Sequence, residues 1–188
     1  LWIAAVVLTL GALTYQDRTG PTFPLEGEFH TAKGPVHFKF LRSEVIGTKL
    51  DLMLADPVPA GVTGYVKYRR YKSTDDWSTQ PMVPGEFKFT RRGRTDGVSG
   101  LGAQLPSLQE RAGKYEFLVY INDGVGEAVS VTKDTPIYAR YKADVPLSVL
   151  VVHVLVIFIC MALAVRTVLA AAVGGEFKWM LWATMGSV

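Results

Sequence analysis

His153 is the residue whose type and setting could most readily do chemistry, since it stands in the apolar run ADVPLSVLVVHVLVIFICMALAVR (143–166). A neutral imidazole in a membrane helix can ligate haem or bacteriochlorophyll, relay protons, or hydrogen-bond to a neighbouring helix. A b-type haem needs a second ligand from another helix, and the other two histidines lie outside the apolar segments. We therefore interpret His153 as a residue that bonds to a protein neighbour or interfacial water, and we expect no cofactor. Haem or bacteriochlorophyll contact and proton relay are the alternatives.

Two further histidines, His30 and His37, flank the turn-like TAKGP. A hairpin there would bring the imidazoles together, but a metal site needs a converging third ligand, which the pattern does not supply. Carboxylates at Asp75-Asp76 and Glu110 lack a neighbour that would tune one as acid and another as base. The sequence also lacks G-x-S-x-G, H-E-x-x-H, Walker and C-x-x-C motifs. We expect no metal site, no catalytic residue and no enzyme activity.

Basic residues gather in two places, one interleaved with aromatic residues and one at a hairpin tip. Such clusters can contact lipid phosphates or an acidic protein, while a solvated strand end is the plainer interpretation. The net charge of +3 is small, so nucleic acid is not an expected partner. The candidate partner or lipid contacts in this region are Arg69, Arg70, Tyr71, Trp77, Arg91, Arg92 and Arg94.

The apolar run predicts the element that carries His153. Residues 145–165 contain no formal charge, and as a helix they measure about 32 Å, enough to cross a hydrocarbon core. Asp144 stands where an N-cap belongs, and Pro146 fits the first helical turn. We therefore expect a transmembrane helix over residues 144–173, with His153 about 10 Å past Pro146.

Apolar residues also stand at both ends of the sequence. Residues 1–14 give about 20 Å of helix, so we expect a partial, uncleaved anchor, with a signal peptide as the alternative. After a turn at 174–178, residues 179–188 are expected to begin a third membrane helix, with an interfacial amphipathic segment as the alternative. Trp179 and Trp182 there suit contact with lipid or a partner at the membrane interface.

The short connection after the long helix predicts the topology. Arg166 and Lys178 flank this turn, which indicates a cytoplasmic location for it and an external one for the large region before the helix. The single cysteine, Cys160, lies in the membrane helix, so the soluble part has no thiol. We expect a multi-pass protein of a bacterial inner membrane, with a linker at 15–26 and a periplasmic domain at 27–142.

Between the anchors the sequence alternates with a period of two and shows no amphipathic helical pattern. VHFKF and KLDLML place every second apolar residue on one face, and GYVKYRRY, KYEFLVYI and PIYARY repeat the pattern. Turn residues such as Asn122-Asp123-Gly124 separate the runs. About seven or eight short strands predict a mainly β domain, an antiparallel sandwich or a small barrel.

One stretch of this region is more specific. LPSLQERAGKYEFLVYI has Leu108, then Gly113, then Tyr115 opening a strand. It resembles the tyrosine corner of immunoglobulin-like and fibronectin type III sandwiches, in which a tyrosine near the start of strand F bonds to backbone just upstream. VTGYVKYRRYKSTDDW, which ends at Trp77, resembles the strand C region of such domains. The resemblance covers residues 34–141 and implies a domain that binds or spaces, without catalytic residues.

The order of an anchor, a β domain and further membrane helices is also similar to that of uncharacterised bacterial inner-membrane proteins with a periplasmic sandwich. That resemblance implies a topology but no activity. We expect a non-catalytic accessory or assembly subunit that docks onto a larger inner-membrane complex, respiratory or photosynthetic, through lipid and integral membrane partners. One alternative is a ligand-binding or sensory membrane protein. The second is a haem- or pigment-binding subunit that uses His153.

Overall fold

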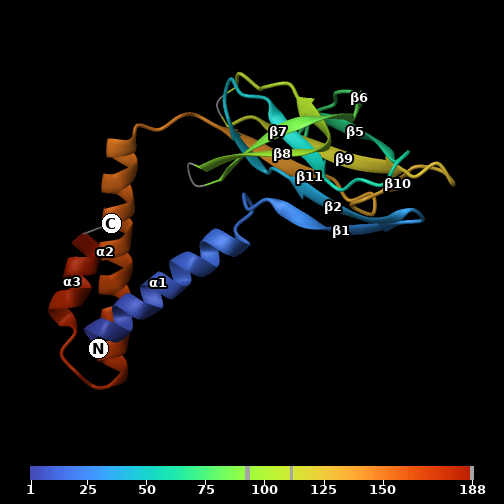
Figure 1. Cartoon of the computed structure of the whole chain (residues 1–188). Coiled ribbons are helices and arrows are strands. Elements are labelled where there is room, and N and C mark those ends of the chain that lie inside the picture. The colour runs from blue at the N-terminus through green and yellow to red at the C-terminus, as the bar shows by residue number, and fades with distance from the viewer. Residues whose placement is uncertain (92–93, 111, 187–188) are drawn as a thin grey trace. The chain divides into compact units, whose positions relative to one another are not determined.

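The chain divides into two compact units, one helical and one built of β-strands (Figure 1). A computed structural model describes residues 1–91, 94–110 and 112–186, and the side chains of 88–91 and 94–96 are outside this description. The helical unit is formed by Leu1–Gly20 and Val145–Val188, and the β unit by Pro21–Asp144. The mainly β domain expected from the alternating pattern is confirmed.

The first sheet of the β unit has the strand order β1-β2-β4-β8-β7, with antiparallel neighbours throughout. Its strands are β1 (Leu25–Thr31), β2 (Gly34–Phe40), β4 (Leu50–Ala55), β7 (Val83–Arg91) and β8 (Arg94–Leu105). Thr31 lies opposite Gly34 in the β1–β2 hairpin, and Arg91 lies opposite Arg94 at the end of the β7–β8 hairpin. Both expected hairpins are therefore present.

The second sheet has the strand order β3-β11-β9-β5-β6, and β10 pairs with β9. Its strands are β3 (Ser43–Val45), β5 (Thr63–Arg70), β6 (Ser78–Pro81), β9 (Lys114–Asn122), β10 (Val129–Ser130) and β11 (Ile137–Lys142). β3 runs parallel to β11, whereas the other neighbours are antiparallel. The described residues form more strands than the seven or eight expected, because strands as short as β3 and β10 show no alternation.

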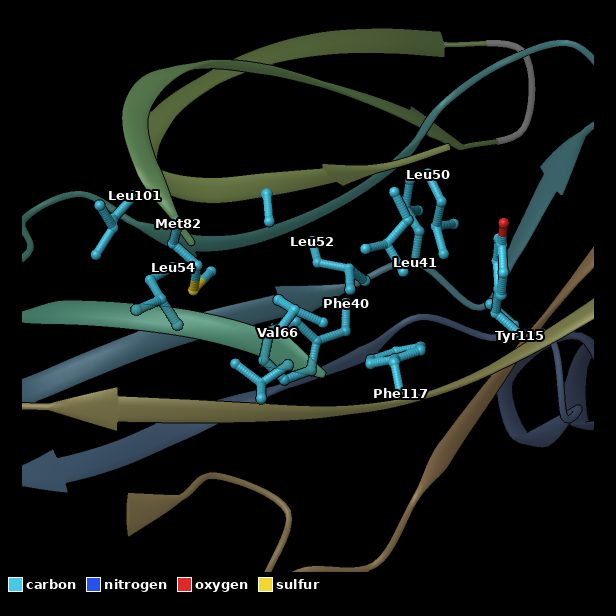
Figure 2. Packing of buried hydrophobic residues seen from close by; sticks show 14 of the residues in the cluster. Phe40, Leu41, Leu50, Leu52, Leu54, Val66, Met82, Leu101, Tyr115 and Phe117 are labelled. Carbon is cyan, nitrogen blue, oxygen red and sulfur yellow. The ribbon is translucent and has the colours of Figure 1, made fainter. Parts of the chain in front are cut away.

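Apolar side chains from both sheets fill the space between them, as Figure 2 shows from close by. Leu50, Leu52 and Leu54 of β4 are fully buried on the inward face. Phe40 of β2 and Phe117 of β9 meet edge-on with ring centroids 6.1 Å apart, which joins the two sheets. Full burial of one such side chain contributes about 1.5–3 kcal/mol to the free energy of folding. The apolar residues at alternate positions therefore hold these strands against the opposite sheet. The inward faces predicted for them are confirmed.

Strands β4 and β8 approach each other closely at Gly100. A Cβ added to this residue would lie 2.1 Å from the carbonyl oxygen of Leu54, well inside van der Waals contact. Gly97 of the same strand has open space at the corresponding position. The sheet therefore requires glycine at 100 but not at 97.

The helical unit contains α1 (Trp2–Thr19), α2 (Leu147–Ala172) and α3 (Lys178–Gly186). α1 continues beyond the expected anchor at 1–14, because Gln16-Asp17-Arg18 is polar but compatible with a helix, and the expected linker at 15–26 is correspondingly shorter. Of the described helices, α2 alone is long and apolar enough to span a membrane. Membrane spans at the two ends of the sequence therefore stay predictions.

The start of α2 differs from the expected one. Pro146 occupies the N-cap position with φ −52° and ψ 134°, and its carbonyl accepts a hydrogen bond from the Leu150 N–H at 3.1 Å. The helix has no side-chain capping bond, so the prediction that Asp144 caps it is wrong. The reason is that the extended Pro146 moves the helix start to Leu147, and Asp144 lies two residues before the N-cap.

Candidate functional site

The outer surface of the second sheet carries many of the aromatic and basic residues singled out in the sequence. Along β5, buried Val66 alternates with Lys67 and Arg69, which lie on the opposite face. We call this surface the aromatic–cationic face. Its members are Arg42, Tyr65, Lys67, Arg69, Tyr71, Lys72, Trp77, Lys114, Tyr120 and Tyr138.

Stacked tyrosines form one end of the aromatic–cationic face. The rings of Tyr65 and Tyr120 lie directly opposite each other in β5 and β9 and stack with centroids 5.1 Å apart. Lys67 Nζ lies 5.4 Å from the Tyr120 ring centroid. The Tyr120 hydroxyl donates to Asp134 Oδ1 at 2.9 Å, and this bond raises the pKa of Tyr120. The end is thus built from contacts within the chain.

Arg69 and Trp77, both predicted as contact residues, lie against each other. The Arg69 guanidinium carbon is 4.6 Å from the Trp77 ring centroid, within cation–π range. Arg69 Nε donates to Glu116 Oε1 at 2.5 Å, across the β5–β9 pair. The Glu116 side chain is 13% exposed and that of Arg69 31%, so this ion pair is partly shielded from water. Arg69 therefore fixes the indole to the sheet.

Arg70 is occupied by carboxylates of its own chain. Its Nε and Nη2 donate to the two oxygens of Asp75 at 2.6 and 3.0 Å, and its Nη1 lies 3.6 Å from Glu110. The hydrogen bond from Arg70 lowers the pKa of Asp75, and the same bond raises that of Arg70. The carboxylates interpreted as loop residues thus compensate the charge of Arg70, which leaves less of it for a partner.

Tyr71, also a predicted contact, belongs to a cluster with Tyr138. The two rings lie with centroids 5.9 Å apart, and Tyr71 is 37% exposed. Lys72 Nζ and Lys114 Nζ each lie 5.5 Å from the Tyr71 centroid, and Lys114 Nζ is also 5.9 Å from that of Tyr138. Tyr71 and Tyr138 therefore share Lys114 of β9, and Tyr71 also has Lys72 from the turn after β5.

The second predicted basic cluster lies at the β7–β8 hairpin. Arg92 falls outside the described residues. Arg91 and Arg94 face each other in the strand pairing, and their side chains are outside the description. A role for these three arginines in partner or lipid contact stays a prediction.

The side-chain hydrogen bond to the loop before β9, which was expected from Tyr115, is made by Tyr141. The Tyr141 hydroxyl donates to the carbonyl oxygen of Pro106 at 3.2 Å, and the Tyr141 N–H donates to Gly113 O at 2.8 Å. Tyr115 is buried at 6% exposure, meets the Tyr141 ring edge-on at 6.0 Å, and has its pKa raised by burial. Leu108 packs at the same turn, 3.0 Å from where a Gly113 Cβ would lie. The expected loop contact therefore comes from β11.

His30 and His37 are brought together by the β1–β2 hairpin. His30 Nε2 lies 3.2 Å from one oxygen of Glu28, and His37 Nδ1 lies 3.7 Å from the other. Glu28 and His37 are directly opposite in the pairing register. Even so, no three His, Cys, Asp or Glu side chains are placed to hold a metal ion in the part of the chain that is described.

The membrane-contact residues predicted in the helices lie on exposed surfaces. His153 is exposed on α2. Trp179 and Trp182 of α3 are 59% and 70% exposed. Their expected contacts with a neighbour or lipid stay predictions, because such partners would lie outside the chain.

Arg166 of α2 was not predicted as a contact residue, because its place in the sequence indicated only a basic residue that flanks the turn after the helix. Its guanidinium carbon lies 5.5 Å from the Trp2 ring centroid of α1. Its Nε and Nη1 atoms are buried and have no hydrogen-bond partner among the described residues. Thr9 Oγ1 of α1 is buried in the same unpaired state. Buried polar groups of this kind usually have hydrogen-bond partners. Both side chains therefore lack a partner that such groups normally have.

A cavity of about 510 Å³ lies at another part of the β unit. The loop after β4, the first residues of β7 and the middle of β8 line it. Its polar groups include Asp56, Glu86 and Ser99. The volume is in the range of small-molecule sites.

Sequence reasoning missed Arg42, Lys114 and Tyr138, which complete the cluster around Tyr71. Their signal was weak but present: KYEF and PIYARY place Lys114 and Tyr138 at alternate, outward positions of their strands. Their proximity depends on the order β11-β9-β5, which local patterns do not determine. No protein-family model matches the chain, and no curated protein matches it.

Proposed function

We propose that this chain is a non-catalytic, membrane-anchored accessory subunit whose β domain and helices dock onto a larger membrane complex. The observation that carries the proposal is the bare apolar surface of α2. Only 6% of its most apolar stretch is buried inside the chain. Surface of this extent is unfavourable in water and is covered when a helix lies among lipids or other helices. The proposed setting is a bacterial inner membrane, with further membrane segments and the β domain in the periplasm.

The β domain is proposed to be an immunoglobulin-like sandwich, a fold that serves mainly in binding. Its strand order supports this. The series β2-β4-β8-β7 corresponds to the order ABED, and β5-β9-β11 to the order CFG, of a constant-type immunoglobulin domain. On this alignment Tyr115 falls in strand F and Trp77 follows strand C.

A protein partner within the membrane is supported by Arg166. The residue is about 28 Å along α2 from its start, close to the far interface of a bilayer. Two of its buried nitrogens have no acceptor among the described residues. A carboxylate or backbone carbonyl on a partner helix would satisfy them once the Arg166 side chain turns away from Trp2, because unpaired charged groups are costly in a low-dielectric setting.

Co-purification tests this proposal. The full chain is tagged in its native host, membranes are extracted with a mild detergent, and the associated proteins are quantified. We expect a stable hetero-oligomer that Arg166→Gln weakens and that Arg18→Gln, a charge removal at the exposed end of α1, leaves intact. Purification of the unmodified chain as a monomer in every mild detergent would contradict the proposal.

A second candidate, a ligand-binding membrane protein, is favoured by the cavity near Asp56 and Glu86. A cationic or polar small molecule would suit its two carboxylates. A thermal-shift screen of the detergent-solubilised chain with small amines tests this candidate. A specific ligand should raise the melting temperature, and Glu86→Gln should abolish the rise. No shift with any amine would count against it.

A further inference from the structure

Three basic side chains contact Tyr71 or Tyr138 at one end of the aromatic–cationic face, and two more lie at exposed positions of β11. We call this group the basic end, and its cations are Arg42, Lys72, Lys114, Arg140 and Lys142. Backbone hydrogen bonds bring them together. The Tyr71 N–H donates to Lys114 O at 2.9 Å, and the Arg140 N–H donates to Arg42 O at 3.1 Å. Four separate chain segments are thereby joined at one surface.

The rings of the basic end hold the cations near one another. Lys114 Nζ lies within 5.9 Å of both tyrosine ring centroids, and the Arg42 guanidinium carbon is 5.2 Å from that of Tyr138. Cation–π contacts at exposed sites are weak and leave the outward N–H donors free to bind anions. The rings thus position positive charge without neutralising it.

Two like charges of the basic end lie directly opposite each other on neighbouring strands. Arg140 and Lys114 are direct partners in the β11–β9 register, and both are exposed. Like charges in that relationship destabilise a sheet. None of the five cations makes an ion pair with a described carboxylate, and Arg42 Nε is buried without a hydrogen-bond partner among the described residues. An anion bound between these groups would relieve the repulsion.

Four carboxylates near the basic end have partners of their own. Glu116 accepts from Arg69, and Asp75 and Glu110 surround Arg70. Glu44 on β3 accepts from the backbone N–H of Val45 at 2.8 Å. The positive charge of the basic end is therefore available to an external anion.

The chain itself ties the basic end to α2. β11 ends at Lys142 and α2 begins at Leu147. Five Cα-to-Cα steps reach at most about 18 Å, whatever the orientation of the two units. If α2 enters a bilayer at its start, Lys142 is held within that reach of the entry point. Tyrosines beside lysine and arginine are the residues that favour such an interface.

We propose that the basic end is a binding site for the phosphate groups of anionic phospholipids. This inference rests on the proposed membrane anchoring for the nearness of lipid. The phosphate oxygens lie between Lys114 and Arg140 and accept hydrogen bonds from the N–H groups of both. Tyr71 and Tyr138 lie at headgroup depth, where their hydroxyls meet water and their rings meet the glycerol region.

The test uses the full chain in a neutral detergent, so that it does not depend on insertion into a bilayer. Dihexanoyl phosphatidylglycerol, dihexanoyl phosphatidylcholine and inorganic phosphate are titrated separately at constant ionic strength, and binding is measured by calorimetry. The test variant is Lys114→Gln with Arg140→Gln. The matched control is Lys67→Gln with Lys133→Gln, which removes the same charge near the Tyr65–Tyr120 end of the face.

We expect phosphatidylglycerol to bind more tightly than either other ligand. Each removed cation should weaken binding about fivefold, giving about 25-fold for the test variant and little change for the control. Equal binding of both lipids, or equal loss in both variants, would overturn the proposal. Equal binding of inorganic phosphate would assign the site to free phosphate instead. Loss of a co-purified acidic protein in the test variant, with lipid binding unchanged, would assign it to that protein.

This result is distinguishable from failure of the proposed function. A chain that binds phosphatidylglycerol but purifies without any partner would keep the lipid site and lose the accessory role. A chain that keeps its partner but shows no lipid preference would lose the lipid site alone.

Discussion

The hydroxyl of Tyr141 donates a hydrogen bond to the carbonyl oxygen of Pro106, with 3.2 Å between the two oxygens. The N–H of the same tyrosine reaches Gly113 O, so one residue of β11 holds both ends of the loop that precedes β9. The Tyr141 side chain is 1% exposed, and burial raises its pKa. The bond is therefore shielded from water and links β11 to the connection from the first sheet.

Removing this hydroxyl should destabilise the β domain. We expect Tyr141→Phe to lower its free energy of unfolding by about 1–2 kcal/mol, because a buried hydrogen bond is lost and Pro106 O is left unsatisfied. Guanidinium unfolding in detergent, followed by near-ultraviolet circular dichroism, measures the change. Tyr115→Phe is the control and should cost less, since its hydroxyl makes no hydrogen bond to this loop within the described ranges. A larger effect of Tyr115→Phe would instead support the tyrosine corner that the sequence predicts at Tyr115.

Gly100→Ala should disrupt the pairing of β4 with β8. The new Cβ would meet Leu54 O at 2.1 Å, so backbone must move, and we expect a loss of about 3 kcal/mol or more. Gly97→Ala, in open space on the same strand, should change stability by less than about 0.5 kcal/mol. Unfolding midpoints of the two variants measure the difference. Similar midpoints would show that the close approach at Gly100 is not required.

Arg69→Lys should weaken the anchoring of Trp77 although it keeps the charge. Lysine has no planar guanidinium to stack on the indole and cannot reproduce the Nε bond to Glu116, so we expect a cost of about 1 kcal/mol. Arg140→Lys, at an exposed position of β11, is the control and should be nearly neutral. Chemical unfolding provides the energies. An equal effect of both substitutions would contradict a specific role for the Arg69–Trp77 stack.

The acid stability of the β domain should depend on Asp123. Its Oδ2 accepts from the Ala32 N–H and its Oδ1 from the Val125 N–H, each at 3.0 Å, which ties the β1–β2 turn to the loop after β9. These bonds, that from Ala32 first, lower the pKa of Asp123 below its ordinary value of 3.8. The stabilisation is therefore present above pH 3.8 and is lost as the pH falls through the lower folded-state pKa.

Asp123→Asn should reduce this acid-dependent loss, because the group no longer titrates. At neutral pH the variant should be less stable than the unmodified chain, and the two should converge as the pH falls below 3.8. Unfolding midpoints between neutral pH and strong acid measure both slopes. The control is Asp144→Asn at an exposed position, which should leave the pH dependence of the unfolding midpoint unchanged. If the pH dependence of Asp123→Asn ran parallel to that of the unmodified chain, the role assigned to Asp123 would be refuted.

Local patterns were enough to predict much of the fold. The inward faces of β2, β4, β5 and β9 follow from alternation, because a period of two places every second side chain on the same side of a strand. The helix around His153 follows from an unbroken apolar run. Asp144 was wrongly predicted as its cap because residue type alone does not reveal the extended conformation that Pro146 adopts before the helix.

The candidate site was predicted only in its β5 part. Arg69, Tyr71 and Trp77 are close in sequence, so their interleaving is visible there. Their partners Glu116, Lys114 and Tyr138 come from β9 and β11, and contacts between distant segments depend on strand order and register. A shift of one residue would turn these side chains to the other face of the sheet.

The sequence by itself determined that this protein has a β-rich region and one long apolar helix, since both follow from the spacing of neighbouring residues. The tertiary structure alone decided that Tyr141 rather than Tyr115 holds the loop at Pro106, and that Lys114 lies opposite Arg140. Long-range pairing forms both relationships. The free energy of such contacts is spread over residues far apart in the chain, so no local pattern records them.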